Sequence, residues 1–452
     1  MENIDKILNN KLYKESLEKL KLYEKDREFC NHTIEHFIDV ARIAYIMVLE
    51  ENIEISKEVI YAIGLLHDIG RVKQYEDGTN HDLASVEMSK EILIIIWMGI
   101  MGVLSTQNQF KRIEFEEDKK VIRYSMGFAL VVMLPLILWA GFREGAGYAD
   151  TNAYIAIYKM LPNNMNELKN YLGNFDKDVG FYFFMGIIKQ IFGTSYRPFL
   201  LIVAIIQGMS LVKFYRKYSE NYVLSIYLFI MAGEGLAWMM NGIRQFLAIS
   251  IIYFAIPWLI KKKYVRFVLI VLLAATVHQT AVVMIPIAFV VQGKPWNKRT
   301  LFVLGIALFA LFATSQFTNL LNETVESTVY AANLTEMSTQ EGMNPLRMLV
   351  YSVPALIALV GRKQIENENS LILNISVNMS IITMALSIMA MMTSGIMIGR
   401  LPIYTGLFNY ILLPYEIECI FECRTARLLK VLMVIMYLLY YYYLMHFAYG
   451  RI

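Results

Sequence analysis

The sequence predicts an all-α protein: a polytopic bundle of transmembrane helices that follows a small N-terminal helical segment. Of its 452 residues, 57% are hydrophobic and only 18% are charged, whereas soluble domains carry roughly 25% charged residues. The charge is also uneven. Residues 1–90 hold 12 Lys and Arg and 18 Asp and Glu, and long apolar runs follow them. We therefore expect two domains, 1–93 and 94–452, of which the second lies in a membrane.

The cysteine content and the net charge exclude several classes of protein. Three cysteines, Cys30, Cys419 and Cys423, form neither a disulfide framework nor the spacing of a zinc ribbon. A net charge of +3 is too small to indicate a nucleic-acid partner. The basic residues cluster between apolar runs, where membrane topology explains them.

The first ninety residues have the pattern of helices. Phe37, Ala41, Ala44 and Val48 are spaced by three and four residues, which marks one face of a helix. Residues 56–67 begin with Ser56, a typical N-cap residue, and continue as an apolar stretch. Asp77 and Gly78 mark a turn, and no part of this segment reads as a strand.

Apolar runs begin directly after this segment, without a linker. Residues 92–105 form a run of 14 residues, short of the roughly 20 that span a bilayer, so this run either crosses the membrane or lies in its interface. The run 266–292 is interrupted at His278, Gln279 and Thr280, which predicts a helical hairpin or a broken helix. The other long runs are 121–141, 196–212, 221–240, 243–260, 300–317, 346–361, 370–392, 403–421 and 428–447.

Basic loops between the runs predict the orientation of the chain. Cytoplasmic loops of membrane proteins are enriched in Lys and Arg, so we expect six segments on that side: 111–120, 213–217, 261–266, 294–299, 362–363 and 424–427. The opposite side then receives 142–195, 238–244, 318–345 and 393–402.

Several ionisable side chains fall on the side opposite the basic loops. They are Arg143, Asp150, Arg244, His278 and Arg400. Ionisable groups near hydrocarbon are costly and tend to be functional, although a single arginine can also reach out to lipid phosphate from the interface. Three arginines and a histidine on one side favour a functional cluster. Two N–H groups of a planar guanidinium can bind two phosphate oxygens at once. A cluster of arginines therefore suits a pyrophosphate.

Residues 95–450 resemble the EpsG family of exopolysaccharide membrane proteins, which are similar to Wzy-type polymerases. The most specific matching segment is 241–248, which reads NGIRQFLA. The other matching segments are Arg143 with 148–151 and Tyr154, then His278, then 400–404. The resemblance implies a multi-pass protein of the bacterial cytoplasmic membrane. Such a protein polymerises polyprenyl-pyrophosphate-linked oligosaccharide repeats on the outer face, together with other exopolysaccharide assembly proteins and without a cofactor.

The resemblance also implies roles for individual residues. Arg143, Arg244, Gln245 and Arg400 would bind the substrate, with Arg244 and Arg400 on the pyrophosphate, where they stabilise the leaving group. Asp150 or His278 would act as the base that takes the proton of the attacking hydroxyl. Two alternatives remain open: Asp150 as a helix cap and His278 as a polar contact at a helix break.

The segment 30–90 resembles the HD superfamily of metal-dependent phosphohydrolases. The resemblance lies in 30–42, in 65–71, which reads LLHDIGR, and in His81. It implies His36, His67 and Asp68 as ligands of a divalent metal. The family pattern ends with a further Asp from a later helix, but here Asp82 follows His81 directly and the next Asp is Asp118. We therefore expect an incomplete metal site in a truncated domain.

Three functions remain open at this stage. The first is a polysaccharide polymerase, and the second is a flippase or transporter of the same lipid-linked sugars. The third is a membrane-anchored HD phosphohydrolase, which requires a complete metal site. The incomplete ligand set predicts no phosphohydrolase activity and little loss of polymer when residues 1–91 are deleted. No nucleic-acid partner is expected.

Overall fold

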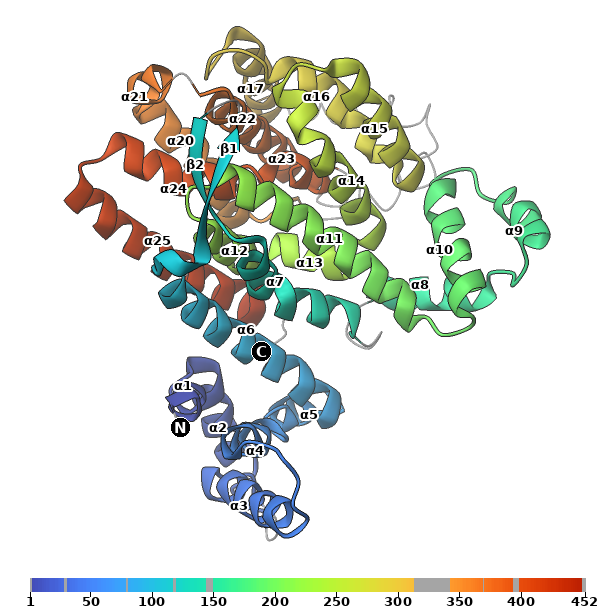
Figure 1. Ribbon diagram of the computed structural model, residues 1–452, viewed down its shortest axis with the longest axis vertical. Coiled ribbons are helices and arrows are strands. Elements are labelled where there is room, and N and C mark those ends of the chain that lie inside the picture. Colours follow the sequence, from blue (N-terminus) through green and yellow to red (C-terminus); the bar gives the residue numbers. More distant parts are fainter. Residues whose placement is uncertain are drawn as a thin grey trace. The chain divides into compact units, whose positions relative to one another are not determined.

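The structure is a computed structural model that describes residues 2–27, 31–78, 80–116, 119–143, 149–312, 342–368, 370–392 and 398–448. These residues are largely helical, which confirms the predicted all-α class (Figure 1). The chain forms two compact units. Unit 1 comprises Met1–Lys111, Leu134–Trp139 and Tyr442–Ile452, and unit 2 comprises Arg112–Met133 and Ala140–Tyr441. The domain boundary between residues 93 and 94 stays a prediction.

Unit 1 is built from five shorter helices and one long helix in its described residues. They are α1 (Glu2–Leu8), α2 (Lys11–Tyr23), α3 (Ile34–Glu50), α4 (Lys57–Leu66), α5 (Arg71–Asp77) and α6 (His81–Leu104), followed by the 3-10 turn η1 (Asn108–Phe110). Ser56 caps α4 as predicted, since its Oγ accepts a hydrogen bond from the Val59 N–H. Gly78 ends α5 in the left-handed conformation, at the predicted turn. The core contains Tyr13, Leu20, Phe37, Leu65, Ile69, Met88 and Ile92.

The apolar run 92–105 is part of a longer helix than the sequence indicated. It forms the second half of α6, whose 24 residues begin at the Asn80 cap. No proline interrupts this stretch, so the helix continues from the polar segment into the apolar one. Among the described residues, α6 is not one of the helices that are both long and apolar enough to cross a membrane.

Unit 2 begins with a two-stranded hairpin, β1 (Lys111–Glu116) and β2 (Lys119–Tyr124), where the sequence predicted a loop. The helices that follow are α7 (Met126–Gly141), α8 (Ala149–Met160), α9 (Met165–Leu172), α10 (Val179–Phe192), α11 (Arg197–Tyr218), α12 (Tyr222–Met231), α13 (Glu234–Met240), α14 (Ile243–Ile260), α15 (Tyr264–Val277), η2 (Gln279–Val283), α16 (Met284–Val290) and α17 (Lys298–Phe312).

The C-terminal part of the bundle contains α20 (Pro345–Val360), α21 (Arg362–Asn367), α22 (Leu371–Met392), η4 (Ile398–Arg400), α23 (Ile403–Gly406), α24 (Asn409–Ile420), α25 (Cys423–Tyr443) and η5 (Leu444–Ala448). The expected loops 318–345 and 393–402, and the end of the run 300–317, lie partly outside the described residues.

Three described helices are long and apolar enough to cross a membrane, namely α11, α14 and residues 371–391 of α22. The pair α12 and α13 meets the same criteria together but bends by 75°. The apolar run 221–240 therefore forms two helices that meet at a bend. Gly233 adopts a φ of 72° at the bend, a conformation that glycine reaches without steric cost.

The break predicted inside 266–292 is confirmed. Helix α15 ends at Val277, His278 is extended with φ −152°, and the chain continues as η2 and α16. Helices α14 and α15 pack together, and α10 packs against α15 (Figure 1). This arrangement brings the start of α10, the start of α14 and the break at His278 to one place.

Candidate functional site

Arg244 lies in the first turn of α14 and is held by three side chains. Its Nη1 donates to Asp178 Oδ2 at 3.0 Å and to the Tyr182 hydroxyl at 3.2 Å, and its Nε donates to the Tyr154 hydroxyl at 3.1 Å. The guanidinium also lies near the faces of both tyrosine rings. The Arg244 side chain remains 26% exposed, so a ligand can reach it.

Asp178 links this arginine to His278. It is the N-cap residue of α10, in the left-handed conformation, and its carboxylate is nearly buried. Oδ2 lies 3.2 Å from His278 Nδ1, and Oδ1 accepts the backbone N–H of Gln279 at 2.9 Å. Burial raises the pKa of Asp178, but the His278 and Gln279 hydrogen bonds and the Arg244 charge outweigh it and lower the pKa below its ordinary value.

An ionised Asp178 fixes the tautomer of the histidine. The carboxylate can only accept, so the Nδ1 of a neutral His278 carries the proton and Nε2 is left as an acceptor. The His278 side chain is 14% exposed. An imidazole oriented by a buried carboxylate in this way can take a proton from a hydroxyl group.

A glycine permits this pairing. A Cβ at Gly180 would lie 2.3 Å from Thr276 Oγ1 and 2.9 Å from the Thr276 carbonyl oxygen. Only glycine therefore allows the start of α10 to approach the end of α15 this closely. The close approach places Asp178 beside His278.

Gln245 connects the same turn of α14 to Arg400. Its Nε2 donates to the Arg400 carbonyl at 2.8 Å, while its buried Oε1 has no hydrogen-bond partner among the described residues. The Arg400 guanidinium lies 5.6 Å from the centre of the Trp238 ring. Thr280 and Tyr404 are also joined through their hydroxyls at 2.9 Å. The segments around His278 and Arg400 are thus tied to the segment around Arg244.

Two of the predicted site residues, Arg143 and Asp150, lie outside the cluster of Arg244, Asp178 and His278. Arg143 is 1% exposed, and it donates to Thr151 Oγ1 at 3.1 Å and to the Ala140 carbonyl. Thr151 in turn donates to the Met240 carbonyl, so Arg143 supports the turn before α14. Asp150 is exposed in the first turn of α8, where the positive end of the helix dipole stabilises a carboxylate.

Asp178 and Tyr182 were not predicted from the sequence. Asp178 follows Asp176 and Lys177 in a polar loop, and no periodicity or motif sets it apart. Tyr182 is one of many aromatic residues of an apolar helix. One signal could have indicated Asp178. Gly180 follows it by two residues, and a glycine inside an apolar helix often marks close packing against another helix.

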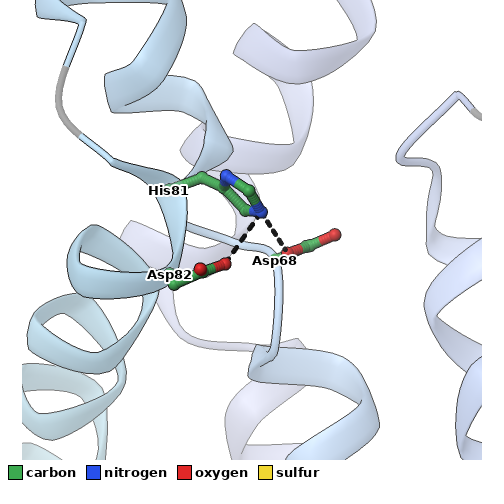
Figure 2. A group of neighbouring side chains, drawn as sticks. All are labelled: Asp68, His81 and Asp82. Carbon is green, nitrogen blue, oxygen red and sulfur yellow. Dashed lines mark ion pairs between the residues drawn. The ribbon is translucent and has the colours of Figure 1, made fainter.

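A second cluster of ligand-type side chains lies in unit 1. Asp68, His81 and Asp82 each offer one atom, and these atoms lie within 4.8 Å of one another. His81 Nε2 is 2.9 Å from Asp82 Oδ1 and 3.6 Å from Asp68 Oδ1, and Figure 2 shows its ring between the two carboxylates. Asp82 is the residue that follows His81 in the first turn of α6, so it is not the later Asp of the family pattern. The incomplete ligand set therefore stays a prediction.

The other predicted ligands lie around Asp68. His67 Nε2 is 3.6 Å from Asp68 Oδ2, and the His36 ring lies 6.1 Å from the His67 ring. His32, which was not predicted, has its Nε2 3.3 Å from Asp68 Oδ2. Imidazoles and carboxylates together suit divalent transition metals. The donor set thus fits the metal that the HD resemblance implies.

Glu24 fixes the orientation of His32. The Glu24 carboxylate accepts the His32 backbone N–H at 2.5 Å and lies 2.7 Å from its Nδ1. Burial raises the pKa of Glu24, but these hydrogen bonds outweigh it and lower the pKa. Burial lowers the pKa of His32 despite the charges of Glu24 and Asp68. A carboxylate behind a histidine is the arrangement that orients metal ligands.

The two clusters fall in parts of the chain that match two different families. The EpsG family profile matches residues 126–451, which include Arg244, Asp178, His278 and Arg400. The chain belongs to the EpsG family. In this EpsG protein, residues 33–126 match the HD domain profile, including His36, His67, Asp68 and His81. The predicted fusion of an EpsG domain with an HD segment is confirmed. The family supports a role in exopolysaccharide synthesis at a membrane.

A relative from Clostridium beijerinckii, described only as an uncharacterized protein, is 42% identical to this EpsG protein over 130 residues. The match covers 26% of this chain and 83% of the relative. No solved structure matches this EpsG protein.

Proposed function

We propose that this EpsG protein joins polyprenyl-pyrophosphate-linked oligosaccharide repeats into a polymer on the outer face of the cytoplasmic membrane. The observation that carries the proposal is the Arg244–Asp178–His278 arrangement, in which a reachable guanidinium and an oriented imidazole share one carboxylate. Such a site combines an anion-binding group with a base. No cofactor is needed for this reaction.

Each residue has a defined part in the proposed reaction. Arg244 and Arg400 hold the pyrophosphate, which is the leaving group, and stabilise the charge that grows on it as its bond to the donor sugar breaks and the acceptor hydroxyl bonds to that sugar. His278 Nε2 takes the proton of the attacking sugar hydroxyl, and Asp178 holds the ring and stabilises its charged form. Asp150, exposed on α8, is not assigned to the base.

A chain-length assay tests this function. Polymer is extracted from cells that express the wild type, Arg244→Lys or the control Arg266→Lys, which changes an exposed arginine at the start of α15. Lysine keeps the charge but loses the paired geometry of the guanidinium. We expect Arg244→Lys to leave single lipid-linked repeats on the outer face and the control to make long polymer. Repeats trapped on the inner face would instead indicate a flippase.

The cluster in unit 1 supports a second candidate function, hydrolysis of a phosphoester with a divalent metal. The supporting observation is the group Asp68, His81 and Asp82, in which Asp82 adds a carboxylate beside His81. A metal bound there would supply a polarised water for hydrolysis. The residues that would hold it are these three, with His67 and His32 beside Asp68.

Purified full-length protein with Mn²⁺ and a phosphomonoester tests this candidate. Asp68→Asn removes a carboxylate charge from the cluster, and Asp39→Asn removes one from an exposed pair with Arg42 on α3. Turnover that is lost in Asp68→Asn and retained in Asp39→Asn supports a hydrolase. Equal turnover in both, or none in the wild type, refutes it.

A further inference from the structure

A basic cavity lies beside the β1–β2 hairpin of unit 2, away from the Arg244 site. It has a volume of about 380 Å³, within the range of small-molecule sites. Its described lining residues include four cations, Arg123 from β2 and Lys213, Arg216 and Lys217 from the end of α11, and one carboxylate, Glu114.

The hairpin fixes the arginines of this cavity. Glu114 accepts from Arg123 Nη1 at 3.3 Å and pairs with Arg216, whose Nε donates to the Tyr124 carbonyl at 2.7 Å. The side chain of Lys213 is exposed, and no carboxylate among the described residues pairs with it. Among the described lining residues, basic side chains thus outnumber carboxylates, and Lys213 is the exposed one.

The cavity also has apolar and aromatic lining residues. They are Met126, Phe214, Tyr218, Tyr253, Phe254 and Pro257. Lys213 Nζ lies 5.1 Å from the centre of the Phe254 ring, so charged and apolar residues adjoin. A site with both kinds of residue fits an amphiphile better than a free anion.

The place of the cavity in the fold also favours a lipid. Its walls come from the last turns of α11 and α14, and both helices are long and apolar enough to cross a membrane. The end of a membrane-spanning helix lies at the level of the lipid headgroups. Basic pockets between such helices bind anionic headgroups.

We propose that this cavity binds the phosphate headgroup of an anionic membrane phospholipid, with the acyl chains leaving along the apolar residues. Lys213, Lys217 and the arginines Arg123 and Arg216 attract the phosphate, and Phe254, Met126 and Pro257 contact the first methylene groups. The site is separate from the proposed polymerase site, because none of its lining residues belongs to the Arg244 cluster.

Lipid binding to the full-length protein in nanodiscs tests the proposal. The discs contain phosphatidylcholine with or without phosphatidylglycerol, and the retained lipid is counted by native mass spectrometry. We expect Lys213→Ala to lower the retention of phosphatidylglycerol about fivefold, and Lys213→Glu on the order of twentyfold. Lys213→Arg should restore it. The control Lys263→Glu changes an exposed lysine that does not line the cavity, and it should retain the wild-type level.

Two results would overturn the proposal. One is equal retention of phosphatidylglycerol by Lys213→Glu and Lys263→Glu, which would show a diffuse surface effect. The other is displacement of the lipid by millimolar inorganic phosphate, which would assign the cavity to a free anion. Because Lys213 is exposed on α11 and has no carboxylate partner in the described structure, its variants should fold, and a thermal melt of each variant verifies this.

Discussion

Asp178 is held by three groups at once, the Arg244 guanidinium, the His278 imidazole and the Gln279 N–H. Its lowered pKa means that the folded protein favours the carboxylate more than the unfolded chain does. The stability from this group is therefore fully present above the ordinary carboxyl pKa of about 4, and it is lost as the pH falls through the lower folded value.

We accordingly predict that Asp178→Asn destabilises the protein at neutral pH by on the order of 3 kcal/mol, because Arg244 loses its carboxylate. The difference from the wild type should shrink as the pH falls below 4. Thermal unfolding in detergent from pH 3 to pH 8 measures both effects. A deficit that is constant across this range would mean that the carboxylate charge is not what stabilises the site.

In unit 1, Glu24 orients His32 beside Asp68, as Asp178 orients His278 in unit 2. We predict that Glu24→Gln weakens Mn²⁺ binding to the full-length protein by about 10- to 100-fold, the usual effect of losing such a partner. Calorimetric titration with Mn²⁺ alone measures it. The control Glu18→Gln changes an exposed carboxylate on α2 and should bind as the wild type does. Equal affinity in the two variants would remove Glu24 from the site.

At the scale of the elements, the approach of α10 to α15 decides whether the site forms. A methyl group at Gly180 meets the backbone of Thr276 as well as its side chain, so it can be accommodated only if the helices move apart. We predict that Gly180→Ala costs about 1–3 kcal/mol of stability and most of the polymerising activity.

Gly305→Ala is the matched control for this prediction, because no atom lies within 4 Å of a Cβ at Gly305 in α17. It should match or slightly exceed the wild type in melting temperature, since alanine favours a helix. If Gly180→Ala leaves both the melting temperature and the polymer unchanged, the close approach does not hold the site.

Some of these elements could be predicted from the sequence and others could not, for physical reasons. The break at His278 and the cap at Ser56 were predictable, because polar residues in an apolar run and N-cap residues are local signals. The bend at Gly233 was not predicted, because an apolar run does not indicate where its helix bends. In the hairpin, residues 111–120 were predicted as a loop and 121–124 as the start of an apolar run, since the charged residues of the hairpin mask the strand pattern.

The same distinction holds for the site. Arg244, His278 and Arg400 stand out because they are charged or polar among apolar residues. Asp178 sits in a polar loop and becomes significant only when α10 packs against α15. Asp82 lies next to His81 in the sequence, and its carboxylate is 2.9 Å from His81 Nε2, a contact that the spacing of the family pattern does not indicate.

The chain carries two candidate sites with different chemistry, one in each unit. We predict that they work independently. His67→Ala, in unit 1, should leave the length of the polymer in cells unchanged, and Arg244→Lys should leave Mn²⁺ binding unchanged. Polymer gels and calorimetry measure the two readouts on the same pair of variants. A loss of polymer in His67→Ala would show that the HD segment controls the membrane unit.

The most direct test of the central claim separates donor binding from turnover at the Arg244 site. Purified full-length protein is supplied with a lipid-pyrophosphate-linked repeat, and both quantities are measured for the wild type, His278→Ala and Asp150→Asn. We predict that His278→Ala binds the donor but loses about 100-fold or more of its turnover, while Asp150→Asn retains both. Full turnover in His278→Ala, with loss of turnover in Asp150→Asn, would contradict it.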